Sequence, residues 1–311
     1  MTRVAAIDIG TNSTRLLVAD VDGEGADAQL RPLEREMRIT RLGAGVDADR
    51  TLRADAIERT VAVLQEYGAT IERLGATRVR ATATSASRDA RNRDEFFDPA
   101  TEALRGVRPE LLSGEEEAAL SFLGATAGLH EPTPYLVFDV GGGSTEFVVG
   151  TDKPEGLISI DIGCVRLTEQ FLQSDPPEAE ELSNAVSAVR DYLADVDREV
   201  RGIAGAATLV GLAGTVTTLA AIELGLNTYD PEAVHHFRLT RQAAEEVFRT
   251  LATEPIAQRR HNPGLDPGRV DVIVGGAIIV VSVLRHFGFA ELLVSEADIL
   301  DGIARSLGTH S

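Results

Sequence analysis

The chain has 311 residues, 43% of them hydrophobic, and a formal net charge of −19. An ordinary apolar fraction without a long polar tract excludes a largely disordered chain, and the length suits two domains of roughly 100–200 residues each. Because so acidic a protein repels nucleic acid and anionic membranes, we expect neither as a partner.

Cysteine and lysine are nearly absent. Cys164 is the single cysteine, so an internal disulfide is excluded, and no Cys/His spacing predicts a zinc site. Lys153 is the only lysine, and arginine, the main cation, matches phosphate oxygens bidentately. The chain starts without a signal-like leader, and its longest apolar run, residues 272–284, is shorter than the roughly 20 residues of a membrane span. We expect a soluble, cytoplasmic protein.

The first part of the chain begins with a predicted β-hairpin. Residues 4–9 and 15–21 read as strands, and the residues between them, 10–13, have turn chemistry. Apolar residues at helical spacing predict a helix over 52–74, and a β-branched run predicts a strand over 78–84.

A second hairpin is predicted in the middle of the chain. It follows a helix that starts with a capping box formed by Ser113 and Glu116. Residues 135–140 and 145–149 are the predicted strands, and the Gly-rich residues 141–144 link them. The remaining predicted elements are a long helix after Pro177, a strand over 209–212 with a helix after it, a helix capped by Thr240, a strand over 292–294 and a helix over 298–307.

The two hairpins form an internal repeat. Residues 5–14 align without a gap on residues 136–145, at an offset of 131 residues, and Asp, Gly, Ser and Thr coincide. A repeat at this spacing predicts two similar domains. Breaks in the pattern around residues 124–134 place the boundary there, giving domains 1–125 and 126–311.

Each copy of the repeat combines groups that suit phosphate. Its glycines let the backbone approach a ligand, and its successive N–H groups can form an anion-binding nest. Asp8 and Asp139, at equivalent strand ends, can hold Mg²⁺ directly or through water. Two such hairpins facing each other would clamp a phosphate chain and its metal between two domains; the alternative is a pair of purely structural turns. No Gly-x-x-x-x-Gly-Lys-Ser/Thr sequence is present, which excludes a Walker-type nucleotide site.

Several ordered motifs resemble those of one enzyme family. They are DIGTNS at 8–13, TSASR at 84–88, SGEEEA at 113–118, DVGGGSTE at 139–146, GCVRLTE at 163–169 and GLAGT at 211–215. The chain is similar over essentially its whole length to the exopolyphosphatase/guanosine pentaphosphate phosphohydrolase family. The resemblance implies an α/β fold of the actin/sugar-kinase superfamily, with two RNase H-like domains flanking an active-site cleft, and Mg²⁺ as cofactor.

The resemblance also implies roles for single residues. Glu117 matches the general base, Arg88 an arginine that contacts substrate phosphate, and Asp139 and Glu146, to which we add Asp8, carboxylates around the metal. The positions expected to bind substrate phosphate are Thr11, Asn12, Ser13, Gly142, Gly143, Ser144, Thr145, Gly214 and Thr215.

Several charged residues near these motifs have a structural or solvent-exposed role as the alternative to a catalytic one. Glu115 and Glu116 are expected only to favour a helix N-terminus, whereas Glu117, one turn inside the helix, is expected to activate water. Arg91 and Arg93 are expected to be solvated, and Arg166 is a weaker candidate for the substrate rim. We expect no catalytic role for His235 or His236. Relatives often carry an Arg-Glu pair where this chain has Leu300-Asp301, so we expect the charge there to be lost.

The sequence leaves the substrate open. The expected activity is release of terminal phosphate from inorganic polyphosphate, and because the chain ends with the core we expect short polymers. Guanosine pentaphosphate is the alternative substrate, an actin-like or sugar-kinase-like use of ATP is a third hypothesis, and a polyphosphate or alarmone sensor with a decayed site is a fourth. A homodimer is expected on base rates alone.

Overall fold

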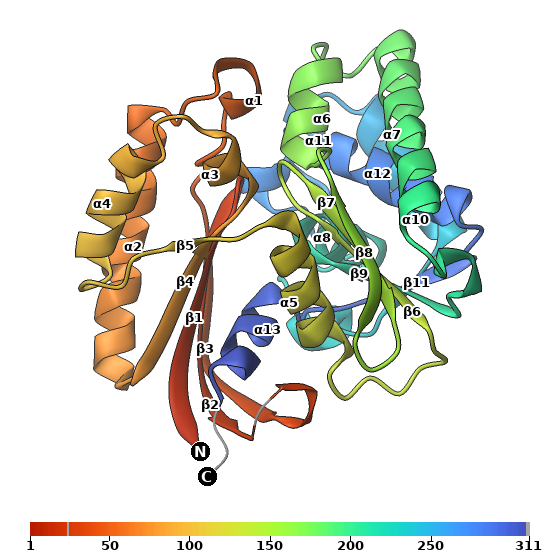
Figure 1. Ribbon diagram of the computed structural model, residues 1–311. Helices are drawn as coiled ribbons and strands as arrows, with labels where there is room; N and C mark the ends of the chain where they lie inside the picture. The colour runs from red at the N-terminus through yellow and green to blue at the C-terminus, as the bar shows by residue number, and fades with distance from the viewer. Residues whose placement is uncertain (24, 309–311) are drawn as a thin grey trace. The chain divides into compact units, whose positions relative to one another are not determined.

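The computed structural model describes residues 1–23 and 25–308. They divide into two compact units: the first contains residues 1–129 and the segment that starts at Asp298, and the second contains residues 130–297. This differs from the two contiguous segments expected from the sequence, because the last helix packs against the sheet of the first unit. In Figure 1 each unit is a β-sheet covered by helices.

The first unit is built on a sheet with the strand order β3-β2-β1-β4-β5. Its strands are β1 (Thr2–Ile9), β2 (Ser13–Asp22), β3 (Gln29–Ile39), β4 (Arg78–Ala83) and β5 (Glu110–Leu111). The first three strands are antiparallel, and β1, β4 and β5 run parallel. The predicted hairpin and the strand over 78–84 are confirmed, whereas β3 was not predicted.

Helices cover both faces of this sheet. They are α1 (Val46–Asp49), α2 (Ala54–Leu74), α3 (Ser85–Asp89), α4 (Asp94–Ala103), α5 (Gly114–Thr126) and α13 (Ile299–Ser306), with the short turn η1 (Gly25–Asp27). Side chains of β1 alternate between two cores: Ile7 and Ile9 pack with residues of α2 and α4, whereas Val4 and Ala6 pack with residues of α13. By the same alternation Asp8 lies on the α13 face.

The second unit repeats this plan. Its sheet has the order β10-β11-β9-β6-β7-β8. The strands are β6 (Tyr135–Val140), β7 (Thr145–Gly150), β8 (Pro154–Ile160), β9 (Thr208–Leu212), β10 (Arg238–Thr240) and β11 (Glu291–Val294). The strands β6, β7 and β8 are antiparallel, and β6, β9 and β11 run parallel. Apart from the added edge strand β10, the two units share one strand order, which confirms two RNase H-like domains of an α/β fold.

The helices of the second unit surround one apolar helix. They are α6 (Cys164–Phe171), α7 (Ala179–Glu199), α8 (Ala213–Glu223), α9 (Pro231–Val234), α10 (Arg241–Thr253), α11 (Ile256–Arg259) and α12 (Ile273–His286), with the turns η2 (Ile203–Gly205) and η3 (Pro267–Arg269). The longest apolar run of the sequence forms α12, which packs against α6, α7, α8 and α10. Within residues 1–23 and 25–308, no helix is long and apolar enough to cross a membrane.

The predicted helix starts are confirmed. Ser113 Oγ accepts a hydrogen bond from the Glu116 amide at 3.2 Å, and the Glu116 carboxylate accepts one from the Ser113 amide at 2.9 Å. Thr240 caps α10 by accepting from the Ala243 amide at 3.1 Å. These caps satisfy amides that have no partner inside the helix.

Candidate functional site

Three parallel strands of the first unit end at one edge of its sheet. Ile9 of β1 is level with Ala83 of β4, and Ala83 is level with Leu111 of β5. Parallel strands point their carboxyl ends the same way, so the segments after them lie side by side. These segments are the turn at 10–13, helix α3 and the start of α5, which together carry the predicted residues of this unit other than Asp8.

Arg88 and Glu117 come together at this edge. Nη1 of Arg88 donates hydrogen bonds to Oε2 of Glu117 at 2.7 Å and to the carbonyl oxygen of Leu112 at 3.0 Å. The exposed fractions of the two charged side chains are 21% and 13%, so the pair is only partly shielded from solvent. Two residues that the sequence predicted for one site, 29 positions apart, are therefore in direct contact.

The neighbouring glutamate has a different task. Glu116 forms the capping box, and hydrogen bonds from the Ser113 backbone and side chain lower the pKa of its carboxyl group. The Glu117 amide already donates to the Ser113 carbonyl at 3.0 Å, as in the body of a helix. The cap therefore fixes where Glu117 emerges from α5, and the structural role expected for Glu116 is confirmed.

The turn at 10–13 is held by its own backbone and by the loop after β3. The Gly10 amide donates to the Ser13 carbonyl at 2.9 Å, and the Asn12 carbonyl accepts from the amides of Thr40 and Arg41 at 3.1 and 2.9 Å. The side chain of Asn12 is 6% exposed, and its Nδ2 has no hydrogen-bond partner within the part of the chain that the structure describes. A buried amide donor of this kind is available to a ligand.

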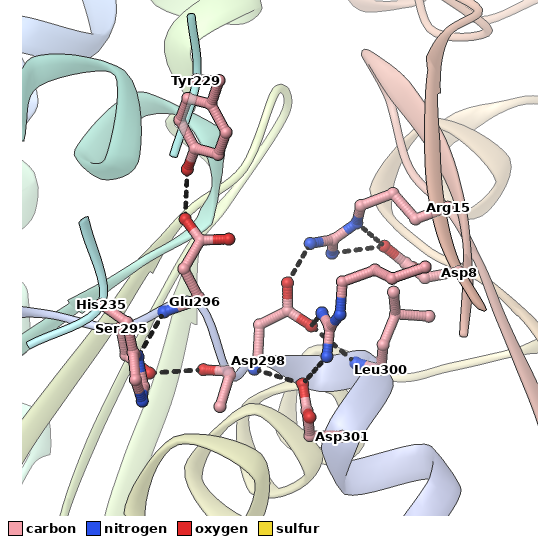
Figure 2. A network of polar contacts seen from close by, with 11 residues as sticks. Asp8, Arg15, Tyr229, His235, Ser295, Glu296, Asp298, Leu300 and Asp301 are labelled. Atoms are coloured by element: carbon pink, nitrogen blue, oxygen red, sulfur yellow. Dashed lines mark hydrogen bonds and ion pairs between the residues drawn. The ribbon is translucent and has the colours of Figure 1, made fainter. Parts of the chain in front are cut away.

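Asp8 lies at one end of an ionic network at the same edge, in which Arg15 links it to Asp298 (Figure 2). Arg15, directly opposite it on β2, donates to Asp8 Oδ2 from Nη2 at 2.7 Å and from Nε at 3.2 Å. Nη1 of Arg15 donates to Asp298 Oδ2. Burial raises the pKa of Asp8, and the charge of Arg15 opposes that shift.

The far side of this network was not predicted. Nη2 of Arg35 donates to Asp301 Oδ2 at 2.7 Å, and the same oxygen accepts from the Asp298 amide at 3.0 Å. Asp298 Oδ1 accepts from the Leu300 amide at 2.9 Å, as Figure 2 shows. The arginine of relatives is replaced by Leu300, as expected, but the buried carboxylate of Asp301 holds the start of α13, which the sequence did not predict.

The second unit repeats the turn geometry. The Gly141 amide donates to the Ser144 carbonyl at 3.0 Å, matching the Gly10 contact. The start of α6 closes over the turn, since the carbonyl of Gly142 accepts from two amides of α6. The hydroxyl of Thr145 is fully buried and donates to the Ile162 carbonyl at 2.5 Å. The prediction that this hydroxyl binds phosphate is therefore not supported, because the hydroxyl is used to fix the loop.

Two carboxylates face each other in the second hairpin. Asp139 on β6 pairs in register with Glu146 on β7, and both are buried, with exposed fractions of 7% and 1%. Opposite residues of an antiparallel pair lie on the same side of the sheet. Glu146 Oε1 accepts a hydrogen bond from Ser159 Oγ at 2.7 Å. In the internal repeat Glu146 aligns with Arg15. The second hairpin therefore has two carboxylates where the first has a carboxylate and a guanidinium.

A glycine and an arginine meet beside this pair. Asp139 is level with Leu212 on the parallel neighbour β9, so the residues after both strands lie at one edge. A Cβ on Gly214 would lie 2.0 Å from Nη2 of Arg269, so any larger residue there requires the guanidinium to shift. The sequence did not identify Arg269, because it sits in a short 3-10 turn far along the chain. Thr215 is buried.

Comparisons with known proteins decide the family. The model of the Ppx/GppA phosphatase family matches residues 6–308. The chain belongs to this family. It is 47% identical to exopolyphosphatase 2 of Mycobacterium tuberculosis over 316 residues, covering 99% of both chains. It also resembles a solved exopolyphosphatase-like protein, with TM-score 0.93, 39% identity and coverage of 99% and 98%. The PPX-GPPA enzyme of Aquifex aeolicus gives TM-score 0.82, 36% identity and coverage of 98% and 99%.

The acidic residues of this Ppx/GppA member suit a hard divalent cation. The donors are carboxylate oxygens, which Mg²⁺ prefers over nitrogen or sulfur. Among the described residues, no group of three or more His, Cys, Asp or Glu side chains is arranged to hold a metal ion. Mg²⁺ is commonly held in proteins by one or two carboxylates together with water and substrate phosphates. The Asp139–Glu146 pair of the second unit offers two carboxylates, and Asp8 of the first unit is a single buried one.

Two further predicted residues have structural partners. Arg166 is 7% exposed, and its Nη1 donates to the Asp161 carbonyl at 3.2 Å. Nδ1 of His235 accepts a hydrogen bond from the Glu296 amide at 3.1 Å, and Glu296 also accepts from the Tyr229 hydroxyl (Figure 2). In this family member the imidazole of His235 thus supports the loop after β11.

Proposed function

We propose that the chain is an exopolyphosphatase that hydrolyses the terminal phosphoanhydride bond of inorganic polyphosphate. The contact between Arg88 and Glu117 carries the proposal, because it joins a carboxylate and a phosphate-binding cation at one edge of a sheet. The substrate class is supported by the name of the Mycobacterium tuberculosis relative, which is 47% identical along the chain.

Glu117 is the proposed general base. An arginine partner favours the ionised form of a carboxylate, which is the form that can accept a proton. In the proposed step, Glu117 orients a water molecule and takes its proton while the water oxygen bonds to the terminal phosphorus. The bridging P–O bond breaks, so inorganic phosphate and a chain shorter by one unit leave. Phosphoryl transfer needs such positioning and charge neutralisation more than covalent work.

Arg88 is the proposed substrate contact. Its Nη1 is directed at Glu117 and Leu112, and the planar fork of a guanidinium matches two phosphate oxygens at once. The buried Nδ2 of Asn12 is a further proposed donor to phosphate. In the second unit, the guanidinium of Arg269 beside Gly214 offers positive charge at the start of α8, whose N-cap residue makes no side-chain cap.

Asp139 and Glu146 in the second unit, and separately Asp8 in the first unit, are the proposed ligands of Mg²⁺. When bound, Mg²⁺ would neutralise the negative charge that accumulates on the phosphates as the bridging bond breaks. Asp139 and Glu146 lie in register on neighbouring strands, and bound Mg²⁺ would offset the repulsion between their carboxylates. The preference for short polymers remains a prediction.

A substrate panel tests the proposal. Released phosphate would be measured with Mg²⁺ and, in parallel, short-chain polyphosphate, long-chain polyphosphate, guanosine pentaphosphate or ATP. We expect the highest kcat/KM with a polyphosphate. A higher kcat/KM with guanosine pentaphosphate would reassign the substrate, and preferential turnover of ATP would overturn the proposal.

A further inference from the structure

The hairpin of β1 and β2 carries two cross-strand Arg–Asp pairs that differ in one respect. Arg3 is opposite Asp20 at one end, and Arg15 is opposite Asp8 at the end that meets the 10–13 turn. Arg3 binds both oxygens of Asp20, with Nε at 2.8 Å from Oδ1 and Nη2 at 3.1 Å from Oδ2. Arg15 directs both Nε and Nη2 to a single oxygen, Oδ2 of Asp8.

Asp298 explains this difference. Its Oδ2 accepts from Nη1 of Arg15, so the guanidinium is held between two carboxylates and is turned away from a fork with both oxygens of Asp8. Asp298 is itself fixed, because its Oδ1 accepts from the Leu300 amide at 2.9 Å and lies 3.8 Å from Nη1 of Arg35. Figure 2 shows Arg15 bridging the two acids.

This arrangement leaves the second carboxylate oxygen of Asp8 without a donor from Arg15. Asp8 is 4% exposed, and its Oδ1 has no hydrogen-bond partner among residues 1–23 and 25–308. A buried anionic oxygen without a partner is costly unless a cation or a donor satisfies it. Around Asp8, two carboxylates, those of Asp8 and Asp298, share the single guanidinium of Arg15.

We infer that Arg15 and Asp298 are positioning residues, which hold the Asp8 carboxylate so that Oδ1 is presented to the divalent cation. The inference rests on the proposed function in taking Mg²⁺ as the cation. Groups that orient a metal ligand from behind commonly affect metal affinity by about 10–100-fold. Neither residue touches substrate in this account.

Titration with Mn²⁺, read by the electron paramagnetic resonance of free Mn²⁺, tests the inference without turnover. Arg15→Gln removes a positive charge, so simple electrostatics predicts tighter Mn²⁺ binding, whereas lost orientation predicts binding weaker by about 10-fold. Arg15→Lys keeps the charge but cannot reach both acids in the same way, and it should also weaken binding. Asp298→Asn should do the same with Arg15 intact.

Arg3→Gln is the matched control, since it breaks the other Arg–Asp pair of the hairpin and should leave the Mn²⁺ dissociation constant unchanged. Thermal denaturation of each variant separates folding from binding. If Arg15→Gln does not fold, Arg15→Lys and Asp298→Asn decide the question. Unchanged or tighter Mn²⁺ binding in the folded variants, or no binding by the wild type, would overturn the inference.

Activity gives a second readout. The Mg²⁺ concentration for half-maximal phosphate release should rise in the Arg15 and Asp298 variants more than the KM for polyphosphate does. A merely structural role would lower Tm without moving that Mg²⁺ concentration. If the wild type releases no phosphate from any polyphosphate, the proposed function fails while the Mn²⁺ titration still decides this inference.

Discussion

Arg88 and Glu117 are joined by a 2.7 Å hydrogen bond at the edge where β1, β4 and β5 end. The partner of the proposed base is thus the proposed phosphate ligand. A substrate phosphate that engages Arg88 must share the guanidinium with Glu117, and this couples substrate binding to the placement of the base.

Arg88→Lys should therefore impair catalysis although the charge is kept. A lysine presents a point charge and cannot serve Glu117, Leu112 and a phosphate with one planar fork. We expect KM for polyphosphate to rise and kcat to fall, with kcat/KM lower by about 10-fold or more, equivalent to at least about 1.4 kcal/mol of transition-state stabilisation. Steady-state kinetics would measure it.

Arg91→Lys is the control for that experiment. Arg91 is exposed and only three residues away, and it was expected to be solvated. Its kinetics should match the wild type. Equal losses in both variants would mean that general loss of positive charge, and not the fork of Arg88, explains the effect.

Asp139→Asn should raise thermal stability while it removes activity. Asp139 and Glu146 are buried acids in register, so without a metal they repel each other. In EDTA the substitution should raise Tm by a few degrees, corresponding to about 1 kcal/mol, while phosphate release with Mg²⁺ is lost. Differential scanning calorimetry and the phosphate assay would be run on one preparation.

Asp20→Asn should change Tm in the direction opposite to Asp139→Asn. Asp20 accepts from Arg3 and Arg31, and the hydrogen bond from Arg3 is the main cause of the lowered pKa of its carboxyl group. Its loss should lower Tm in EDTA. If Asp139→Asn lowered Tm as well, repulsion between Asp139 and Glu146 would not be what limits the stability of the metal-free protein.

Gly214→Ala should disturb the second unit through Arg269. The new Cβ would lie 2.0 Å from Nη2 of Arg269, so the guanidinium must move. We expect kcat/KM to fall by about 10-fold or more, as for other displaced binding groups. Gly205→Ala is the control, because a Cβ there meets nothing within 4 Å. A wild-type kcat/KM for Gly214→Ala would show that Arg269 has no part in turnover.

The pKa of the Cys164 thiol predicts how the stability of the protein depends on pH. Burial is the largest cause that raises its pKa, against the opposing charge of Arg269 and a hydrogen bond from Thr215. A raised pKa means that the folded protein keeps the thiol protonated above about 8.5, the value in an unfolded chain. This contribution to stability is complete below about pH 8.5 and is lost as pH rises towards the folded pKa.

Reaction with a disulfide reagent at pH 8 tests whether the Cys164 thiol is buried and protonated in the folded protein. The folded protein should react slowly, and the same protein in guanidinium should react within the mixing time. Rapid reaction of the folded protein would mean that Cys164 is accessible and that its environment is not the one described.

The hairpins and their acids could be predicted from the sequence because the relevant signals are local. Asp8 and Asp139 end apolar strands at turn sequences, and the repeat aligns them without a gap. The capping box that places Glu117 is equally local.

Other features depend on distant contacts. The edge strand β3 was not predicted because its residues are half-buried or exposed, many are charged, and Pro32 interrupts it. Arg35, Asp298 and Asp301 meet only because α13 returns to the first sheet. Thr145 carries a hydroxyl of the expected type, but only the three-dimensional contact shows that Ile162 uses it.

The most direct test of the account is the kcat of Glu117→Gln with polyphosphate and saturating Mg²⁺. Glutamine preserves the shape and a hydrogen bond to Arg88 but cannot accept the proton of water. Because general base catalysis contributes roughly 10²–10⁴-fold, kcat should fall by at least about 100-fold while KM and Tm stay near the wild-type values. A kcat within a few-fold of the wild type would contradict the assignment of Glu117 as the base, and with it the proposed mechanism.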